Sequence, residues 1–312
     1  MPYNLIPAQN EGQWMEILNN IDCYDTYHLP QYYLIAWKNG EGDPWLFWFR
    51  EDNYNACVPL LLIENKAKSA YGYPCILNNF NYQTNPKLKD NFQNCFLDFL
   101  NKRQIDDLFI RQNPLFRNSW LFNNFGVIEI IGNTVVIDLA QPDEIQLSGL
   151  TKGHKYDIRK AIKNGMRVIE GNYFRDIDGF INIYNETMQR NGANEYYYFS
   201  RKYFFDLKEK LGNHIRLFFA ELNGEITSGA LFFFCNRIIQ YHLSGTSEKY
   251  LDAGGAKCII DHVRQIGIKE DYQWLHLGGG VGADEENSLF KFKAGFSKIR
   301  LPFEIIKWQK IS

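Results

Sequence analysis

The sequence predicts an α/β protein made of two similar halves, in which mixed central sheets are flanked by helices. Residues 45–62, "WLFWFREDNYNACVPLLL", have the pattern of a strand, a polar turn and a second strand, and residues 216–233 repeat it. In both halves an amphipathic helix and a further strand follow this hairpin. A hydrophobic content of 45% and a charged content of 22% are typical of a folded domain.

The elements of the first half follow in a definite order. A helix is predicted to begin within "HLPQYYLIAW" (28–37), ahead of the hairpin at 45–62. A third strand is expected near Tyr71, in "AYGYP". Phe92, Phe96 and Phe99 then recur at helical spacing, and "DLFIRQN" has the pattern of the next strand.

The second half repeats this order. "FSRKYFFDLK" (199–208) corresponds to the first helix, and the third strand is expected near Tyr241. Ile259, Ile260, Val263 and Ile266 mark a helix, which "YQWLHLG" follows as a strand. Several matched elements in one order favour duplication over a chance likeness of two hairpins. The boundary is expected after "VVIDLAQPDEIQ", which gives domains 1–145 and 146–312.

Composition excludes several classes of protein. The formal charge of −2 offers no overall attraction to DNA, so a polyanion site must be a local patch. The six cysteines are scattered and the six histidines are never paired at ligand spacing, so no metal is expected. No signal peptide is evident, and apolar runs such as "VPLLLI" are too short for a transmembrane segment. The default expectation is a cytoplasmic enzyme.

The glycine run "HLGGGVGADEE" (276–286) fits the spacing of a dinucleotide fingerprint, but its context does not. That motif belongs in a first βαβ unit, with its helix N-terminus open to pyrophosphate. Here it lies near the end of the chain, and Asp284, Glu285 and Glu286 follow, whose charges would repel a phosphate. We expect the glycines instead to let a strand end pass close to another backbone or to a substrate.

The motifs and their order resemble the FemAB-like acyltransferases, tandem GNAT-fold proteins that include peptidoglycan bridge-forming enzymes. The residues that carry this resemblance are "SAYGYPCIL" (69–77), "LFIRQNPLF" (108–116), "VVIDL" followed by "HKYDIRKAIKNGMRV" (154–168), "YHLSGTS" (241–247) and the closing "LHLGGG…LFKFKAGFSKIRLPF". The resemblance implies a fold of two GNAT domains, the second of which holds the acyl-transfer site.

The same resemblance implies that Phe292 and Lys293 lie beside the reacting acyl group. Acyl transfer to an amine passes through a tetrahedral intermediate with a developing oxyanion, which an ammonium group stabilises. Lys293 would serve in this way, while Phe292 excludes water. Lys291 is the less suitable lysine because it precedes the matched position. A solvated lysine on a helix face is the alternative for either residue.

Other residues are candidates for binding the substrate. Residues 152–167 hold six Lys or Arg against the single Asp157, and Arg159 belongs to a stripe that suits the phosphates of a nucleotide sugar or of an RNA acceptor stem. Arg190 in a tyrosine-rich segment, and Tyr71 and Tyr73 of the first half, suit a sugar or nucleotide. A solvated helix face and ordinary aromatic packing are the respective alternatives.

Tyr241 and His242 on the expected third strand are further substrate-binding candidates. His242 suits a general base for the incoming amine, although a hydrogen-bonded core histidine is the commoner case. Gly254, Gly255 and Ala256 resemble the end of the GNAT pyrophosphate loop, which binds acyl-CoA through backbone N–H groups. Leu251 stands at its Arg or Gln position and Asp252 adds the wrong charge, so a tightly packed helix start is the alternative.

These features predict an N-acyltransferase whose acceptor is an amine of a cell-envelope precursor, either a peptidoglycan stem peptide or an amino sugar. The donor is an aminoacyl-tRNA, with the acceptor stem as a partner, or an acyl-CoA. One alternative is an acyl-CoA-dependent N-acetyltransferase acting on an amino sugar or another small amine. A second is a non-catalytic sugar-binding protein.

Overall fold

The computed structural model describes residues 2–21, 23–80 and 86–310, which divide into two compact units. The first unit comprises residues 1–132 and 301–312, and the second comprises residues 133–300. Each unit has its own sheet and its own hydrophobic core. No helix of the described chain is long and apolar enough to cross a membrane.

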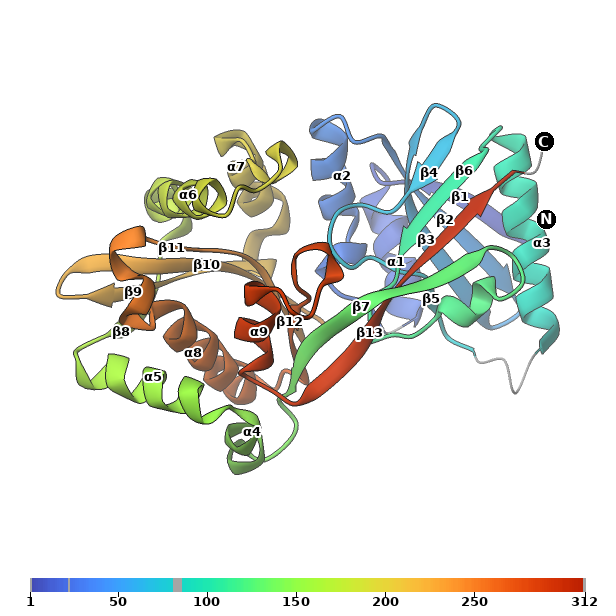
Figure 1. Ribbon diagram of the computed structural model, residues 1–312. Helices are drawn as coiled ribbons and strands as arrows, with labels where there is room; N and C mark the ends of the chain where they lie inside the picture. Colours follow the sequence, from blue (N-terminus) through green and yellow to red (C-terminus); the bar gives the residue numbers. More distant parts are fainter. Residues whose placement is uncertain (1, 22, 81–85, 311–312) are drawn as a thin grey trace. The chain divides into compact units, whose positions relative to one another are not determined.

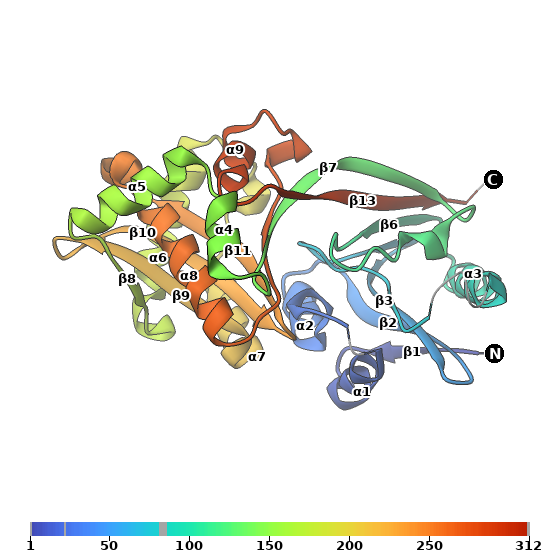
Figure 2. The same cartoon turned by 90° about the horizontal axis from the view of Figure 1, so that it is seen from below.

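The first unit contains a mixed, mostly antiparallel sheet with helices on both faces (Figure 2). Its elements are β1 (Tyr3–Pro7), α1 (Glu11–Ile21), η1 (Thr26–His28), α2 (Pro30–Lys38), β2 (Asp43–Glu51), β3 (Tyr54–Ile63), β4 (Lys66–Lys68), β5 (Leu77–Asn78), α3 (Pro86–Lys102), β6 (Asp107–Arg111), η2 (Ser119–Phe122), the start of β7 (Val127–Asp138) and most of β13 (Ile299–Gln309).

Alternation along β2 decides which side chains enter the core of this unit. Phe47 and Phe49 are fully buried on the face that α3 covers. Phe96, from the expected helix, packs against Phe47 with ring centroids 4.9 Å apart. Tyr33 of α2 donates a hydrogen bond to the carbonyl of Pro59 at 3.0 Å. The periodicity seen in the sequence therefore selects the buried face of each element.

The second unit also has helices on both faces of its sheet, with α6 and α7 on one face and α5 and α8 on the other (Figure 1). Its elements are α4 (Asp143–Gly149), α5 (Lys152–Lys163), β8 (Arg167–Glu170), α6 (Tyr173–Arg190), η3 (Glu195–Tyr197), α7 (Arg201–Leu211), η4 (Gly212–His214), β9 (Ile215–Leu222), β10 (Glu225–Cys235), β11 (Ile238–Thr246), η5 (Glu248–Ala253), α8 (Gly255–Lys269), β12 (Trp274–Gly278), η6 (Val281–Ala283) and α9 (Ser288–Ala294).

The two units repeat one succession of elements and one pattern of strand pairing. In the first, α2, β2, β3, β4, α3 and β6 follow one another; in the second, α7, β9, β10, β11, α8 and β12 do so. The third strand of each set pairs antiparallel with the second and parallel with the last. A tandem duplication of one α/β fold is therefore confirmed.

The third strand of the first unit lies earlier than expected. It is β4, at Lys66–Lys68, whereas Tyr71 lies in a bend and "AYGYP" forms no strand. Gly72 has a φ of +94°, and a Cβ there would lie 2.1 Å from the Tyr27 ring. A left-handed glycine followed closely by Pro74 interrupts the ladder, which corrects the expected position of this strand.

The division of the chain also differs from the expected boundary near residue 145. The second half of β7, from Val135, pairs with β12, and Val135 and Ile137 belong to the core of the second unit. In turn, β13 pairs with β6, and Ile306 belongs to the core of the first unit. The first unit thus completes its sheet with β13, which follows the whole second unit in the sequence, and the second unit begins with the second half of β7.

Candidate active site

In the second unit, the neighbouring parallel strands β11 and β12 separate part-way along their length. β11 pairs with β12 only from Ile238 with Trp274 to Gln240 with His276, although β11 continues to Thr246. Beyond His276, a bulge in its pairing with β7 redirects β12, which ends at Gly278 with a φ of +78°. Ligands of open α/β sheets bind outside the carboxyl ends of strands, so this parting is a favourable position for a site.

Lys293 reaches the end of β12 from the short helix α9. Asn287 caps this helix by accepting a hydrogen bond from the Leu289 backbone, and Phe290 anchors it in the core. The Lys293 ammonium donates a hydrogen bond to the carbonyl oxygen of Gly279 at 2.7 Å. It also lies 5.9 Å from the centre of the Tyr241 ring. Both contacts hold one cation at the point where β11 and β12 separate.

Burial makes Lys293 chemically unusual. The residue is only 8% exposed, and burial lowers the pKa of its amine from 10.5 to about 7. Lys291, two residues earlier, is 59% exposed and pairs with Glu286 at 2.7 Å. The two lysines of "FKFKAGF" therefore differ in kind: Lys291 is an ordinary surface cation, whereas Lys293 changes its charge near neutral pH.

His154, which the sequence reasoning missed, fixes the segment that carries Lys293. Its Nε2 donates to the carbonyl of Phe292 at 2.8 Å, so its Nδ1 accepts from the Thr151 hydroxyl at 3.2 Å. Burial lowers the pKa of His154 and keeps the ring neutral. A Cβ on Gly295 would lie 2.2 Å from this ring, which explains the glycine of "KAGF".

Phe292 contributes to this arrangement through both its backbone and its ring. The ring is half-buried and lies 5.6 Å from the ring of Phe296. Phe296 also packs edge-on against His154, with centroids 4.7 Å apart. The aromatic side chains expected to exclude water therefore line α9 and its end.

Tyr241 and His242 lie on opposite faces of β11, so the structure brings only Tyr241 to Lys293. The Tyr241 ring packs on Phe232 at 5.1 Å, and burial raises the pKa of its hydroxyl to about 12. His242 stacks on Phe233 at 4.1 Å, and burial lowers its pKa to about 3. An imidazole with this pKa is a weak base at neutral pH.

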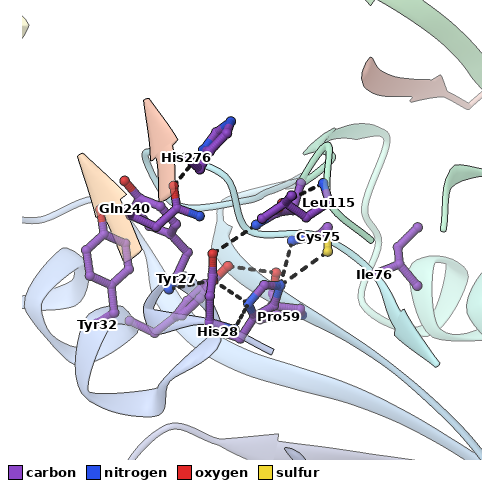
Figure 3. Close-up of polar contacts among 12 residues, drawn as sticks. Tyr27, His28, Tyr32, Pro59, Cys75, Ile76, Leu115, Gln240 and His276 are labelled. Atoms are coloured by element: carbon purple, nitrogen blue, oxygen red, sulfur yellow. Dashed lines mark hydrogen bonds and ion pairs between the residues drawn. The ribbon is translucent and has the colours of Figure 1, made fainter. Parts of the chain in front are cut away.

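A second buried histidine, His276, belongs to the last residue pair between β11 and β12 (Figure 3). The sequence reasoning also missed this residue. The Nδ1 of His276 lies 2.6 Å from the Oε1 of Gln240, and because an amide oxygen only accepts, Nδ1 carries the proton. Burial and the nearby Lys293 lower the pKa of His276 to about 3. The interaction joins residues 36 positions apart in the sequence, so only a knowledge of strand register would have revealed it.

Close packing explains one of the glycines at the start of α8. Gly254 is left-handed, with a φ of +79°. Gly255 is buried, and a Cβ there would lie 2.4 Å from the Thr227 hydroxyl oxygen. Ala256 follows as a half-buried residue of the first turn. Close contact with β10 therefore accounts for Gly255, and a role of the segment in cofactor binding stays a prediction.

The two predicted arginines differ in their surroundings. Arg159 is exposed on α5. Arg190, at the end of α6, is half-buried and donates from Nη2 to the Thr187 hydroxyl at 3.3 Å. That hydroxyl also accepts from the backbone of Thr246 at 2.9 Å, which places Arg190 near the carboxyl end of β11. Its Nη1 is buried and has no hydrogen-bond partner among the described residues.

Tyr71 and Tyr73 belong to the first unit and pack within it. The carbonyl of Tyr71 accepts a hydrogen bond from the Tyr32 hydroxyl at 3.1 Å. The ring of Tyr73 packs edge-on against Phe303 at 5.0 Å and against Tyr27 at 6.0 Å. Their role in binding a sugar stays a prediction.

The first unit also brings together four buried side chains from three segments of the chain, around His28 and Cys75 (Figure 3). The Nδ1 of His28 lies 2.8 Å from a carboxylate oxygen of Asp25, and its Nε2 lies 3.3 Å from the sulfur of Cys75. Asn113 donates to the other carboxylate oxygen at 2.9 Å. All four are almost fully buried, and burial holds the pKa of the Cys75 thiol well above its usual range. This network therefore ties η1 to residue 75, and the raised pKa of the Cys75 thiol makes it a poor nucleophile.

A family comparison bears on the second unit. Residues 152–291 match the model of the Acetyltransferase (GNAT) domain family. This range includes α5, the parting of β11 and β12, and Lys291 at its last position. The segment is a GNAT acetyltransferase domain, and the chain is an acyltransferase. No curated protein sequence matches the chain significantly.

Solved structures share the fold along the whole chain. FemX superposes with a TM-score of 0.72 at 12% identity, covering 99% of this chain and 98% of its own. The C-terminal domain of a putative lysylphosphatidylglycerol synthetase from Agrobacterium fabrum gives 0.63 at 12% identity, covering 97% and 93%. A tandem GNAT protein from the clavulanic acid biosynthesis pathway gives 0.54 at 10% identity, covering 99% and 100%. The expected tandem GNAT fold is thereby confirmed.

Proposed function

We propose that this acyltransferase transfers an acyl or aminoacyl group to an amine of a cell-envelope precursor, with Lys293 as the group that stabilises the oxyanion. The observation that supports this proposal is the position of Lys293: a buried amine, held at the parting of two parallel strands in a GNAT domain. A solvated surface lysine, the alternative weighed from the sequence, does not describe a side chain that is 8% exposed.

The proposed reaction is a direct displacement at the acyl carbon. The neutral acceptor amine attacks this carbon, a C–N bond forms, and the carbonyl electrons move to the oxygen. The protonated Lys293 donates a hydrogen bond to that oxyanion, after which the bond to the leaving oxygen or sulfur breaks and the amine's surplus proton passes to the leaving group or to solvent. Holding donor and acceptor together supplies much of the acceleration.

A lysine whose pKa is near 7 suits this task for a physical reason. Before reaction, its neutral and charged forms are of similar stability, so burial does not require a permanent full charge. A nearby oxyanion raises the pKa of the amine by direct attraction. The ammonium form is therefore favoured at the step where negative charge develops on the substrate.

The acceptor class rests on the family resemblance and on the fold shared with FemX. The amine of a peptidoglycan stem peptide and that of an amino sugar are both compatible with a direct displacement. Arg190, whose Nη1 is buried without a partner in the described chain near the end of β11, supplies a cation for an anionic group of such a precursor.

Two donors remain for this reaction. An aminoacyl-tRNA fits a family whose members use aminoacyl esters, and it agrees with Leu251 and Asp252 in place of a regular pyrophosphate loop. The alternative is an acyl-CoA-dependent N-acetyltransferase acting on an amino sugar or another small amine. It is favoured by the match to an acetyltransferase family and by Gly254, the N-cap of α8, because no side chain caps the N–H groups of this helix start.

A direct assay tests the proposal. The protein is incubated with acetyl-CoA or with charged tRNA, and with a stem-peptide precursor or an amino sugar, and amide products are detected by mass spectrometry. We expect one donor and acceptor pair to yield product. Lys293→Met should lower that rate about 100-fold, the usual loss for one oxyanion donor, whereas Lys291→Met should not. Equal rates in the two variants would contradict the role of Lys293.

A further inference from the structure

The outer surface of α5 is a continuous basic face. Its buried side holds His154, Ile158 and Ala161, which pack into the core of the second unit. The cations are spaced along the opposite side at helical intervals. We call them the α5 basic face: Lys152, Lys155, Arg159, Lys160 and Lys163.

None of these five cations has an acidic side chain within ion-pair distance in the described chain. The only carboxylate on α5, Asp157, is turned toward α8, where it pairs with Lys257. Several cations elsewhere in this unit are neutralised: Arg201 pairs with Asp178, and Arg216 pairs with Glu170. The net charge of the whole chain is only −2, so the α5 basic face is a local concentration of uncompensated charge.

Exposed apolar side chains accompany the cations. Tyr156 is 64% exposed and Ile162 is 58% exposed, both on α5. Ile145 of the preceding helix α4 is exposed as well. The main apolar face of α5 packs into the protein core, so only these side chains could enter a bilayer. Cations beside exposed tyrosine and isoleucine side chains suit the headgroup layer, where phosphates lie next to the apolar boundary.

We propose that the α5 basic face binds the surface of an anionic phospholipid membrane. The cations meet the headgroup phosphates, while Tyr156 and Ile162 enter the boundary with the acyl chains. The backbone of duplex RNA offers the same phosphates, but it provides no apolar phase for Ile162, which favours the lipid surface. The proposal does not depend on the transfer chemistry, because binding needs neither donor nor acceptor.

The position of this face connects it to the acyl-transfer segment. The backbone N–H of Thr151, which caps α5, donates to the carbonyl of Gly295 at 2.9 Å. His154, on the buried side of α5, holds the carbonyl of Phe292. A membrane bound to the outer side of α5 would therefore lie one helix away from the segment that carries Lys293.

Vesicle co-sedimentation of the full chain tests the proposal. Vesicles of phosphatidylcholine alone are compared with vesicles to which phosphatidylglycerol has been added. The triple variant Lys152→Gln, Arg159→Gln, Lys163→Gln removes charge from the α5 basic face. A matched control, Lys66→Gln, Lys87→Gln, Lys269→Gln, removes the same charge from exposed sites elsewhere. Thermal unfolding of each variant checks that it folds.

We expect the wild type and the control to bind the anionic vesicles, and the α5 triple variant to bind about 100-fold more weakly. Tyr156→Ser should also weaken binding, with no change of charge. Equal binding by the two triple variants, or no preference of the wild type for phosphatidylglycerol, would overturn the proposal. Loss of binding to a short RNA duplex in the α5 triple variant, without any vesicle binding by the wild type, would overturn it in favour of RNA.

Discussion

Lys293 lies in surroundings that favour its neutral form, and this should lower the stability of the protein at low pH. In the unfolded chain the amine has its ordinary pKa of 10.5, and in the folded chain its pKa is about 7. Between these values the unfolded state binds more protons, so the stability contributed by this group rises with pH. Below pH 7, the folded state carries the full cost of a buried charge.

A substitution by methionine should therefore stabilise the protein. At pH 6.5 we expect Lys293→Met to raise the free energy of unfolding by about 3 kcal/mol, and the gain should shrink as the pH rises toward 10. Urea denaturation across this pH range measures it, and Lys291→Met, at an exposed site, serves as the control. If Lys293→Met gave no gain in the free energy of unfolding, or a gain that grew with pH, the folded protein would not hold a buried, charged Lys293 at pH 6.5.

The contact between Gly295 and His154 makes a second prediction. Because a Cβ at residue 295 would overlap the imidazole ring, Gly295→Ala should cost about 2 kcal/mol of stability. In a His154→Ala background the ring is gone, and the same change should cost far less. A double-mutant cycle measures this coupling, and additive effects of the two substitutions would mean that the ring does not occupy this space.

At the scale of elements, the first turn of α8 packs against β10 through Gly255. Gly255→Ala should cost about 2 kcal/mol of stability, because the new Cβ would overlap the Thr227 hydroxyl. Gly254→Ala should cost about 1 kcal/mol for its left-handed backbone alone.

Gly179, inside α6, is the matched control for α8. A Cβ there meets nothing within 4 Å, so Gly179→Ala should be neutral or slightly stabilising. Thermal unfolding ranks the three variants. If Gly255→Ala proved as harmless as Gly179→Ala, close packing would not explain why residue 255 is a glycine. A need for space for a bound ligand would then be the better explanation.

Elements with a strong hydrophobic periodicity could be predicted from the sequence. Elements whose ends depend on one backbone dihedral angle could not. The hairpin of β2 and β3 follows from alternation, and α3 follows from Phe92, Phe96 and Phe99 at helical spacing. The third strand of the first unit was misplaced because Gly72 and Pro74 end the ladder after β4. The correspondence of "AYGYP" with the segment near Tyr241 in the second half suggested a strand, whereas the left-handed angle of Gly72 appears only in the folded chain.

The site was predictable only in part, for a similar reason. Lys293 was found through its motif, but its burial depends on the carbonyl of Gly279 at the end of another element. His154 and His276 act through partners 138 and 36 residues away in the sequence, so a search for local spacing could not detect them. The opposite placement of Tyr241 and His242 does follow from alternation along a strand.

At the scale of the whole molecule, duplication was visible in the sequence but the division of the chain was not. The repeated order of helix, hairpin, strand, helix and strand predicts two units. The assignment of β7 and β13 to them depends on which strands they pair with, and long-range pairing leaves no local signature. For this reason the expected boundary fell within the second unit.

The thiols offer a prediction for the whole chain. No disulfide joins the six cysteines in the described chain; Cys23 is exposed, whereas Cys57, Cys75, Cys235 and Cys258 are buried. Burial raises the pKa of the thiols of Cys57 and Cys258, which slows their reaction further. A thiol reagent should therefore modify one cysteine rapidly in the native protein and all six in denaturant without a reductant. Fewer than six in denaturant would reveal a disulfide.

The pH dependence of kcat/KM for acyl transfer tests the role of Lys293 most directly, with wild type and Lys293→Arg compared on one acceptor. The ionisation of the acceptor enters both profiles and cancels in their ratio. Because the wild-type amine loses its proton as the pH rises through about 7, whereas a guanidinium stays charged, the ratio of wild type to variant should fall about tenfold per pH unit above 7. A ratio that does not change with pH would contradict an oxyanion held by the charged form of Lys293.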